Sequence, residues 1–233
     1  MSENDTIVQP DAFPESAAQV YLRGPAGRLE CLTDQPEAEA RQPAVAVICH
    51  PHPQHGGTMF NKVVTIIERS LRELGLRTVR FNFRGVGDSE GDYDEGHGEL
   101  DDLRAVINWV RHTCPGHELW LAGFSFGSWI AAQAAAESGT RQLISIAPPV
   151  ERGDFAAIHI PGCHWLVVQG DEDEVVSPQA VYDWIADAEP KPELIVMKKA
   201  GHFFHRRLMD LRGLLKNSLR DHLPDHASPN KSA

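Results

Sequence analysis

The stretch ELWLAGFSFGSWIAAQAAAES, residues 118–138, combines an apolar run, a glycine-rich turn and an alanine-rich segment. Residues 118–124 predict a buried strand, residues 126–138 predict a helix, and the turn between them reads G-F-S-F-G over 123–127. Glycines on both sides of such a turn relieve crowding around a strained central serine. The hydroxyl of Ser125 would then lie at a helix N-terminus, where N–H groups and the helix dipole favour developing negative charge. Ser125 is therefore predicted to be a nucleophile.

A second G-x-S-x-G sequence occurs at residues 87–91 and is centred on Ser89. The strand-like run TVRFNF precedes it, but the segment that follows, DYDEGHGELDD, is acidic and glycine-rich. Because no helix opens at Ser89, we interpret it as a loop residue, and the strand–turn–helix context selects Ser125.

A nucleophilic serine needs a histidine as general base and an acid that orients the histidine. The apolar run at residues 164–170, HWLVVQG, predicts a strand, and four acids, DEDE, follow it directly. Open α/β sheets place their sites just past the carboxyl ends of strands, which is where these acids would lie. Asp173 is the candidate acid, and the nearby Asp171 stays open as its alternative.

The candidate base follows the next apolar run, ELIVMKK at residues 193–199, which is succeeded by Ala-Gly-His. Gly201 predicts a tight turn that presents the ring of His202. His205, a little further along the chain, is the alternative base. We prefer His202 because of the turn that precedes it.

Strand and helix patterns alternate along most of the chain. The alternation predicts a single α/β domain with a mostly parallel central sheet and helices on both faces. Expected strands span residues 19–23, 28–32, 44–49, 77–83, 118–124, 141–147, 164–170 and 193–199, and the first two form a hairpin. Expected helices span residues 62–75, 99–114, 126–138, 177–188 and 206–223.

Several segments together are similar to the α/β-hydrolase superfamily, and more narrowly to small bacterial serine hydrolases that lack a lid domain and whose substrates are mostly unknown. The resemblance implies an α/β-hydrolase fold, and in that superfamily the acid usually ends a G-x-x-D sequence. Here that sequence is residues 170–173, which favours Asp173. The segments that carry the resemblance are HPHPQHGGTMFNKVV (50–64), RFNFRGVGDSEG (80–91), GELDDLRAVINWV (98–110), LAGFSFGS (121–128), QGDEDEVV (169–176) and AGHFF (200–204).

The resemblance also implies an oxyanion hole made of two backbone N–H groups. The superfamily's H-G-x loop corresponds here to residues 50–52, His-Pro-His, so the first donor would be the N–H of His52. Pro51 and Pro53 have no N–H, which narrows the choice of backbone donors in this loop. The second donor would be the N–H of Phe126, the residue after the nucleophile.

Only residues 148–164 separate Ala147 from Trp165, and this segment is too short to hold a helical cap domain. We therefore expect an open site, which suits small or medium esters better than long acyl chains. The expected activity is that of a serine hydrolase cleaving a carboxylic ester, with thioesterase or amidase and peptidase chemistry as alternatives. A non-catalytic binding protein would be expected to have lost part of the triad, whereas all three positions are occupied.

Two further patterns suggest metal ions. Three histidines within residues 50–55 follow H-x-H-x-x-H, but their two intervening prolines suit a rigid loop better than a metal site. Residues 88–99 space their acids like a calcium loop but lack the glycine at its sixth position, and a strand precedes them. Aromatic residues flank Ser125, and of Phe124 and Phe126 we expect one to belong to the core. We expect no metal and no cofactor.

Composition limits the partners. The chain has 233 residues, is 42% hydrophobic and carries a net charge of −11, which argues against nucleic acids and anionic membranes as partners. A small-molecule substrate remains, and the oligomeric state is left open. No apolar run approaches the length of a membrane span.

The two ends of the chain are polar and contain proline and serine, so residues 1–17 and 224–233 are expected to be flexible tails around a domain at 18–223. The N-terminal segment MSENDTIVQPDAFPES has neither the basic nor the apolar region of a secretory signal. The four cysteines are scattered without C-x-x-C pairing, which indicates reduced thiols. We therefore expect a cytoplasmic protein.

Overall fold

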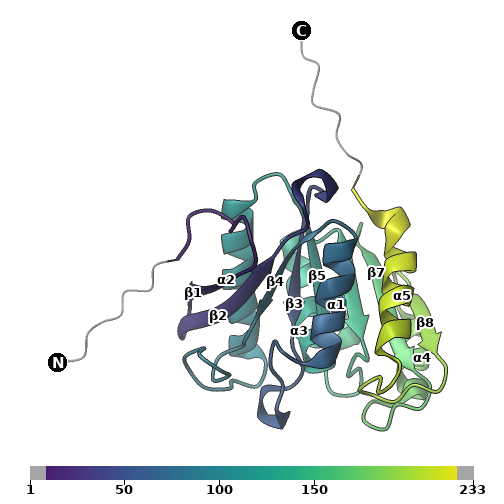
Figure 1. Cartoon of the computed structure of the whole chain (residues 1–233). Coiled ribbons are helices and arrows are strands. Elements are labelled where there is room, and N and C mark those ends of the chain that lie inside the picture. Colours follow the sequence, from purple (N-terminus) through teal and green to yellow (C-terminus); the bar gives the residue numbers. More distant parts are fainter. Residues whose placement is uncertain (1–8, 225–233) are drawn as a thin grey trace.

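Eight strands form one sheet in the computed structural model of the chain, which describes residues 9–224 (Figure 1). Their order across the sheet is β1-β2-β4-β3-β5-β6-β7-β8. Strands β3 to β8 run in the same direction, whereas β2 is antiparallel to both β1 and β4. The strands are β1 Ala18–Gly24, β2 Gly27–Asp34, β3 Ala44–Cys49, β4 Arg77–Phe81, β5 Glu118–Phe124, β6 Gln142–Ile146, β7 His164–Gly170 and β8 Glu193–Met197. The mostly parallel sheet agrees with the alternating pattern of the sequence.

Some helix ends have a cap that the sequence provides. The side chain of Asn61 accepts a hydrogen bond from Val63 N–H at the start of α1, and Gly139, at a φ of 60°, ends α3. Within residues 9–224 no helix has both the length and the apolar character needed to cross a membrane. The helices are α1 Lys62–Glu73, α2 His97–Thr113, α3 Phe126–Ser138, α4 Pro178–Asp187 and α5 Leu208–Leu219.

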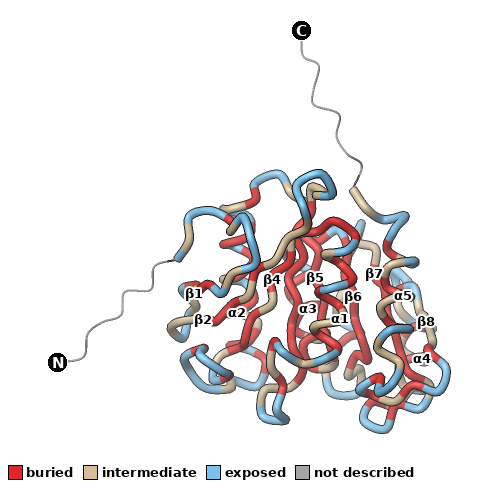
Figure 2. The backbone as a smooth tube through the Cα atoms, in the orientation of Figure 1, coloured by how far each residue is buried: buried red, intermediate tan, exposed pale blue. Residues whose placement is uncertain are grey.

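Helices cover both faces of the sheet and create two buried layers (Figure 2). One layer lies between the sheet and helices α1 and α5, and the other lies between the sheet and helices α2, α3 and α4. Strand β3 is buried along its whole length, because it lies in the middle of the sheet with helices on either side. This rigid centre holds the carboxyl ends of the parallel strands, where the candidate residues lie.

The connection between β6 and β7 holds only a short 3-10 turn, at Phe155–Ala157. No helical cap is therefore inserted at this point, as the length of the segment predicts. The four cysteines, Cys31, Cys49, Cys114 and Cys163, are free thiols.

The N-terminal segment differs from the sequence expectation. Residues 9–17 were expected to be a flexible tail, but Phe13 is buried and its ring stacks on Trp109, with centroids 5.6 Å apart. The indole N–H of Trp109 also donates a hydrogen bond to the carbonyl of Pro10, at 2.8 Å. The ring of Phe13 and the carbonyl of Pro10 thus attach this segment to helix α2. Residues 1–8 and 225–233 of the expected tails lie outside the described residues.

Candidate active site

Ser125 occupies the turn between β5 and α3 in a conformation that is strained for a residue with a side chain. Its φ is 51° and its ψ is −122°. The turn is held by a hydrogen bond from Ser125 N–H to the carbonyl of Ile146, at 2.8 Å, and by two bonds from Ser128 to the carbonyl of Ser125. The predicted strand–turn–helix context of Ser125 is therefore present.

Two glycines permit this turn because other backbone atoms occupy the space of a side chain. A Cβ on Gly123 would overlap the carbonyl of Gly127. A Cβ on Gly127 would overlap the carbonyls of Cys49 and His50, at the end of β3. The first turn of α3 therefore packs directly on the loop that follows β3, and this contact places Ser125 beside that loop.

Asp173 and His202 form a hydrogen-bonded pair in which Nδ1 of His202 lies 2.9 Å from Oδ2 of Asp173. The same oxygen accepts a bond from the amide Nε2 of Gln169, at 3.0 Å, and Oδ1 accepts the N–H groups of Val175 and Val176, each at 2.8 Å. Burial alone would raise the pKa of Asp173, but the contact with His202 and the backbone donors outweigh it and lower the pKa. The carboxylate is thus kept ionised and fixed.

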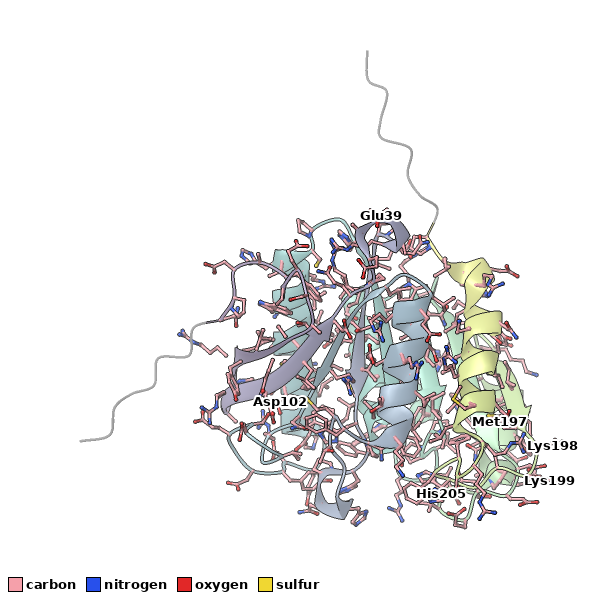
Figure 3. The ribbon with its side chains drawn as sticks, in the orientation of Figure 1. Glu39, Asp102, Met197, Lys198, Lys199 and His205 are labelled. Carbon is pink, nitrogen blue, oxygen red and sulfur yellow. The ribbon has the colours of Figure 1, made fainter. Side chains whose placement is uncertain are left out.

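The alternative acid, Asp171, is turned toward a different region. Its Oδ1 accepts the N–H of Lys199 at 2.6 Å, and Lys198 Nζ lies 3.4 Å from its Oδ2. Figure 3 shows both lysines just beyond β8. Partial burial raises the pKa of Asp171, but the contacts with Lys199 and Lys198 outweigh it, so that the pKa is lowered overall. Within the described residues it is Asp173, and not Asp171, that contacts His202.

His202 is held from three sides. Its backbone N–H donates to the carboxylate of Glu174 at 3.1 Å, and its ring lies 5.0 Å from the ring of Phe124. A Cβ on Gly201 would lie 2.6 Å from Oε2 of Glu174, so a side chain at this position would displace the carboxylate that accepts the N–H of His202. The alternative base, His205, is exposed and does not line the cavity that contains Ser125.

The loop after β3 is organised by His50, which is completely buried. Its Nδ1–H donates to the carbonyl of Pro51 at 2.6 Å, and its Nε2 accepts the N–H of Phe83 at 3.0 Å. Both ring nitrogens are therefore occupied, which leaves none to bind a metal ion. A Cβ on Gly57 would overlap the carbonyl of Pro51, because the loop folds tightly back on itself.

The two candidate oxyanion donors lie on this loop and on the first turn of α3. Within residues 9–224, neither the N–H of His52 nor that of Phe126 donates a hydrogen bond. The rings of the two residues pack against each other, with centroids 5.0 Å apart. The N–H at the first position of a helix has no partner within the helix and can bind an anion.

Burial of His50 leads to a testable dependence of stability on pH. It lowers the pKa of this imidazole to about 4, although the hydrogen bond to Pro51 opposes the shift. Since the unfolded chain takes up this proton near pH 6.5, stability falls as the pH drops from that value toward the folded pKa. Between about pH 7 and about pH 4.5 this loss should amount to about 2–3 kcal/mol. The free energy of unfolding, measured with urea at both pH values, should fall by about 2–3 kcal/mol less in His50→Gln than in wild type. In His112→Gln, which changes a surface histidine, it should fall as much as in wild type.

Ser125 and His202 open into one cavity of about 280 Å³. Phe126 lines it, while Phe124 is fully buried in the core, in agreement with the expectation that one of the two belongs there. A smaller cavity of about 40 Å³ also reaches Ser125. Many residues in the wall of the larger cavity have aromatic or imidazole rings, namely His52, His55, Tyr93, Phe126, Trp129 and Phe203. The wall also includes two charged side chains, those of Glu95 and Arg152.

The remaining sequence candidates have structural roles. Ser89 is buried, its hydroxyl donates to the carbonyl of Asn82 at 2.7 Å, and it accepts the N–H of Glu30 at 2.9 Å. Glu99, the last acid of the calcium-like segment, instead accepts backbone N–H groups at the start of α2. Ser89 therefore holds a loop in place, and Glu99 caps the start of α2.

Comparisons with known proteins identify the family to which this fold belongs. A family model for the alpha/beta hydrolase fold matches residues 47–160. An α/β serine hydrolase without a lid from Xanthomonas campestris is 52% identical, with a TM-score of 0.89 and coverage of 94% of this chain and 100% of that one. The chain belongs to the α/β-hydrolase family.

Two further proteins are similar to the chain over most of its length. An α/β serine hydrolase homologue from Coxiella burnetii is 47% identical, with a TM-score of 0.86 over 89% of this chain and 100% of that one. An uncharacterised protein of Rickettsia prowazekii is 36% identical over 199 residues, which cover 80% of this chain and 82% of that protein. Like the Xanthomonas protein, which has no lid, this chain has no helical insertion between β6 and β7 of its eight-stranded sheet.

Proposed function

We propose that the chain is a serine hydrolase that cleaves carboxylic esters of small or medium size through an acyl-enzyme. The observation that supports this most directly is the strained Ser125, which shares a cavity with a histidine whose Nδ1 is bonded to a buried carboxylate. Since Nδ1 of His202 is committed to Asp173, Nε2 is the nitrogen that can serve the serine. Membership of a family of serine hydrolases points in the same direction.

In the proposed reaction, the hydroxyl oxygen of Ser125 attacks the ester carbonyl while Nε2 of His202 takes its proton. The carbonyl oxygen becomes an oxyanion that accepts the N–H groups of His52 and Phe126. His202 then gives the proton to the departing alcohol, and an ester of Ser125 remains. Water, deprotonated by the same nitrogen, cleaves this ester and regenerates the serine. Asp173 holds the imidazole in the required tautomer and stabilises its charge, and no cofactor takes part.

The shape of the site predicts a preference for short acyl chains. The cavity holds about 280 Å³, and no lid extends it. Each added methylene contributes ~0.8 kcal/mol only where it is buried, so acyl chains of about two to six carbons should be preferred. Measuring kcat/KM for p-nitrophenyl esters of increasing length tests this. A continuous rise to about twelve carbons would contradict the prediction, because it requires an acyl tunnel that buries every methylene.

The same assay, extended to matched thioesters and aminoacyl amides, tests the reaction itself. We expect kcat/KM to be highest for the esters. If thioesters or amides were turned over faster than the esters, the proposed substrate bond would be the thioester or the amide instead. Absence of turnover together with absence of labelling of Ser125 by a fluorophosphonate would refute the assignment as a serine hydrolase.

A further inference from the structure

A row of polar side chains crosses the opposite end of the sheet from Ser125. Gln142 and His164 begin the neighbouring strands β6 and β7 and pair directly, and Glu193 begins β8 opposite Leu166. Because side chains alternate between the two faces of a strand, all three polar residues of the row point to the same face. These positions are the amino ends of parallel strands, whereas the candidate active site lies at the carboxyl ends.

A fourth side chain reaches this row from the C-terminal end of α5. His222 belongs to the short helix Arg220–His222, and its ring stacks on that of His164 with centroids 3.6 Å apart. Figure 1 shows the end of α5 at the edge of the molecule opposite the loops that carry the candidate site. The cluster therefore joins the end of the described chain to the start of the sheet.

The hydrogen bonds of the row determine which nitrogen of His164 is free. The amide Nε2 of Gln142 donates to the carbonyl of Leu143 at 3.1 Å, so its Oε1 faces His164. Nδ1 of His164 lies 2.8 Å from that oxygen and must carry the proton of the bond. A neutral His164 is then left with a lone pair on Nε2.

That lone pair points at another acceptor, since Nε2 of His164 lies 2.9 Å from Oε2 of Glu193. Two acceptor atoms at this separation repel each other unless a proton or a metal ion lies between them. One ligand atom each from His164, Glu193 and His222 lies within 4.8 Å of the other two. Because the lone pairs of two parallel stacked rings lie in separate planes, the ring of His222 would have to turn out of its stack on His164 to bring the three atoms to bond lengths of about 2.0–2.2 Å around one ion. Glu193 and His222 are exposed, so their side chains have room to turn.

We propose that His164, Glu193 and His222 bind a divalent transition-metal ion of the zinc class. Two imidazoles and one carboxylate are the donor set that Zn²⁺ and similar ions prefer, and water would complete the coordination. Gln142 acts as the outer partner that fixes the tautomer of His164, as carbonyl groups commonly do for histidine ligands. The ion would clamp the segment after α5 to strands β7 and β8, and the site is independent of the proposed hydrolysis.

Titration with Co²⁺, followed by its visible absorption, and with Zn²⁺, followed by calorimetry, tests the site in the full chain. We expect one equivalent of either ion to bind, and Zn²⁺ at about 100 times its dissociation constant to raise Tm by about 5–10 °C. His222→Ala and Glu193→Gln should each weaken binding by at least about 10-fold. His112→Ala removes an exposed histidine on α2 and should leave binding unchanged.

The candidate active site also contains histidines, and the same titration separates the two sites. Binding that survives both His222→Ala and Glu193→Gln, or that is lost in His52→Ala, overturns the proposal. Absence of binding at micromolar concentrations of either ion overturns it as well. Because His222 and Glu193 are exposed, loss of folding is not expected to obscure these variants, and circular dichroism checks it.

Discussion

Ser125→Ala is expected to lower kcat for p-nitrophenyl acetate by at least about 10⁴-fold, because the variant has no oxygen to form the acyl-enzyme. The fold should be unaffected, since the hydrogen bonds of Ser125 within residues 9–224 are made by its backbone N–H and carbonyl. Alanine at a φ of 51° is no more strained than serine. Initial rates measure the loss, and mass spectrometry of fluorophosphonate-treated wild type should locate one adduct on Ser125.

Ser89→Ala is the matched control, since it alters the second G-x-S-x-G sequence. The hydroxyl of Ser89 bonds to backbone groups of Glu30 and Asn82, so its loss should destabilise the fold by about 1–3 kcal/mol. The variant should nevertheless be labelled by the probe. An adduct on Ser89 in wild type, or full activity of Ser125→Ala, would show that the nucleophile has been assigned to the wrong residue.

The fold and the placement of Ser125 could be predicted because their causes are local. The alternation of apolar runs and helical patterns predicts which segments are strands and which are helices, and Gly123 is needed within the turn itself, where a Cβ would overlap the carbonyl of Gly127. Residues 148–164 are short enough to exclude a cap by length alone. Each of these features depends on neighbours in the sequence, so a single chain contains the required information.

Partners that are distant in sequence could not be predicted in this way. His50 was considered as a metal ligand, but its Nε2 accepts the N–H of Phe83, which only the sheet brings near. Glu174 was one of four adjacent acids, and its contact with the backbone of His202 depends on how two loops meet. Gln169 did leave a signal, because it is a polar residue inside the apolar run HWLVVQG. The structure explains it through its bond to Asp173, although the other amide atom, Oε1, is buried without a partner among the described residues.

Asp173→Asn is expected to lower kcat by about 10⁴-fold, and the hydrogen bonds around the carboxylate explain why. Oδ1 accepts two backbone N–H groups, those of Val175 and Val176, so the carbonyl oxygen of an asparagine must take that position. The amide NH₂ then faces Nδ1 of His202. Two donors cannot share a hydrogen bond, so His202 must move its proton to Nε2, the nitrogen that would otherwise accept the proton of Ser125.

The matched control, Asp171→Asn, changes the neighbouring acid without touching His202. Asp171 bonds to the N–H of Lys199, which an asparagine oxygen can still accept, and its ion pair with the exposed Lys198 contributes little. Its kcat should therefore stay within a few-fold of wild type, a prediction that rate measurements on both purified variants can check. If Asp171→Asn proved the more damaging change, the acid would have to approach His202 in a conformation different from this one. The contrast between two acids two residues apart thus tests the tautomer of His202 separately from the loss of one negative charge.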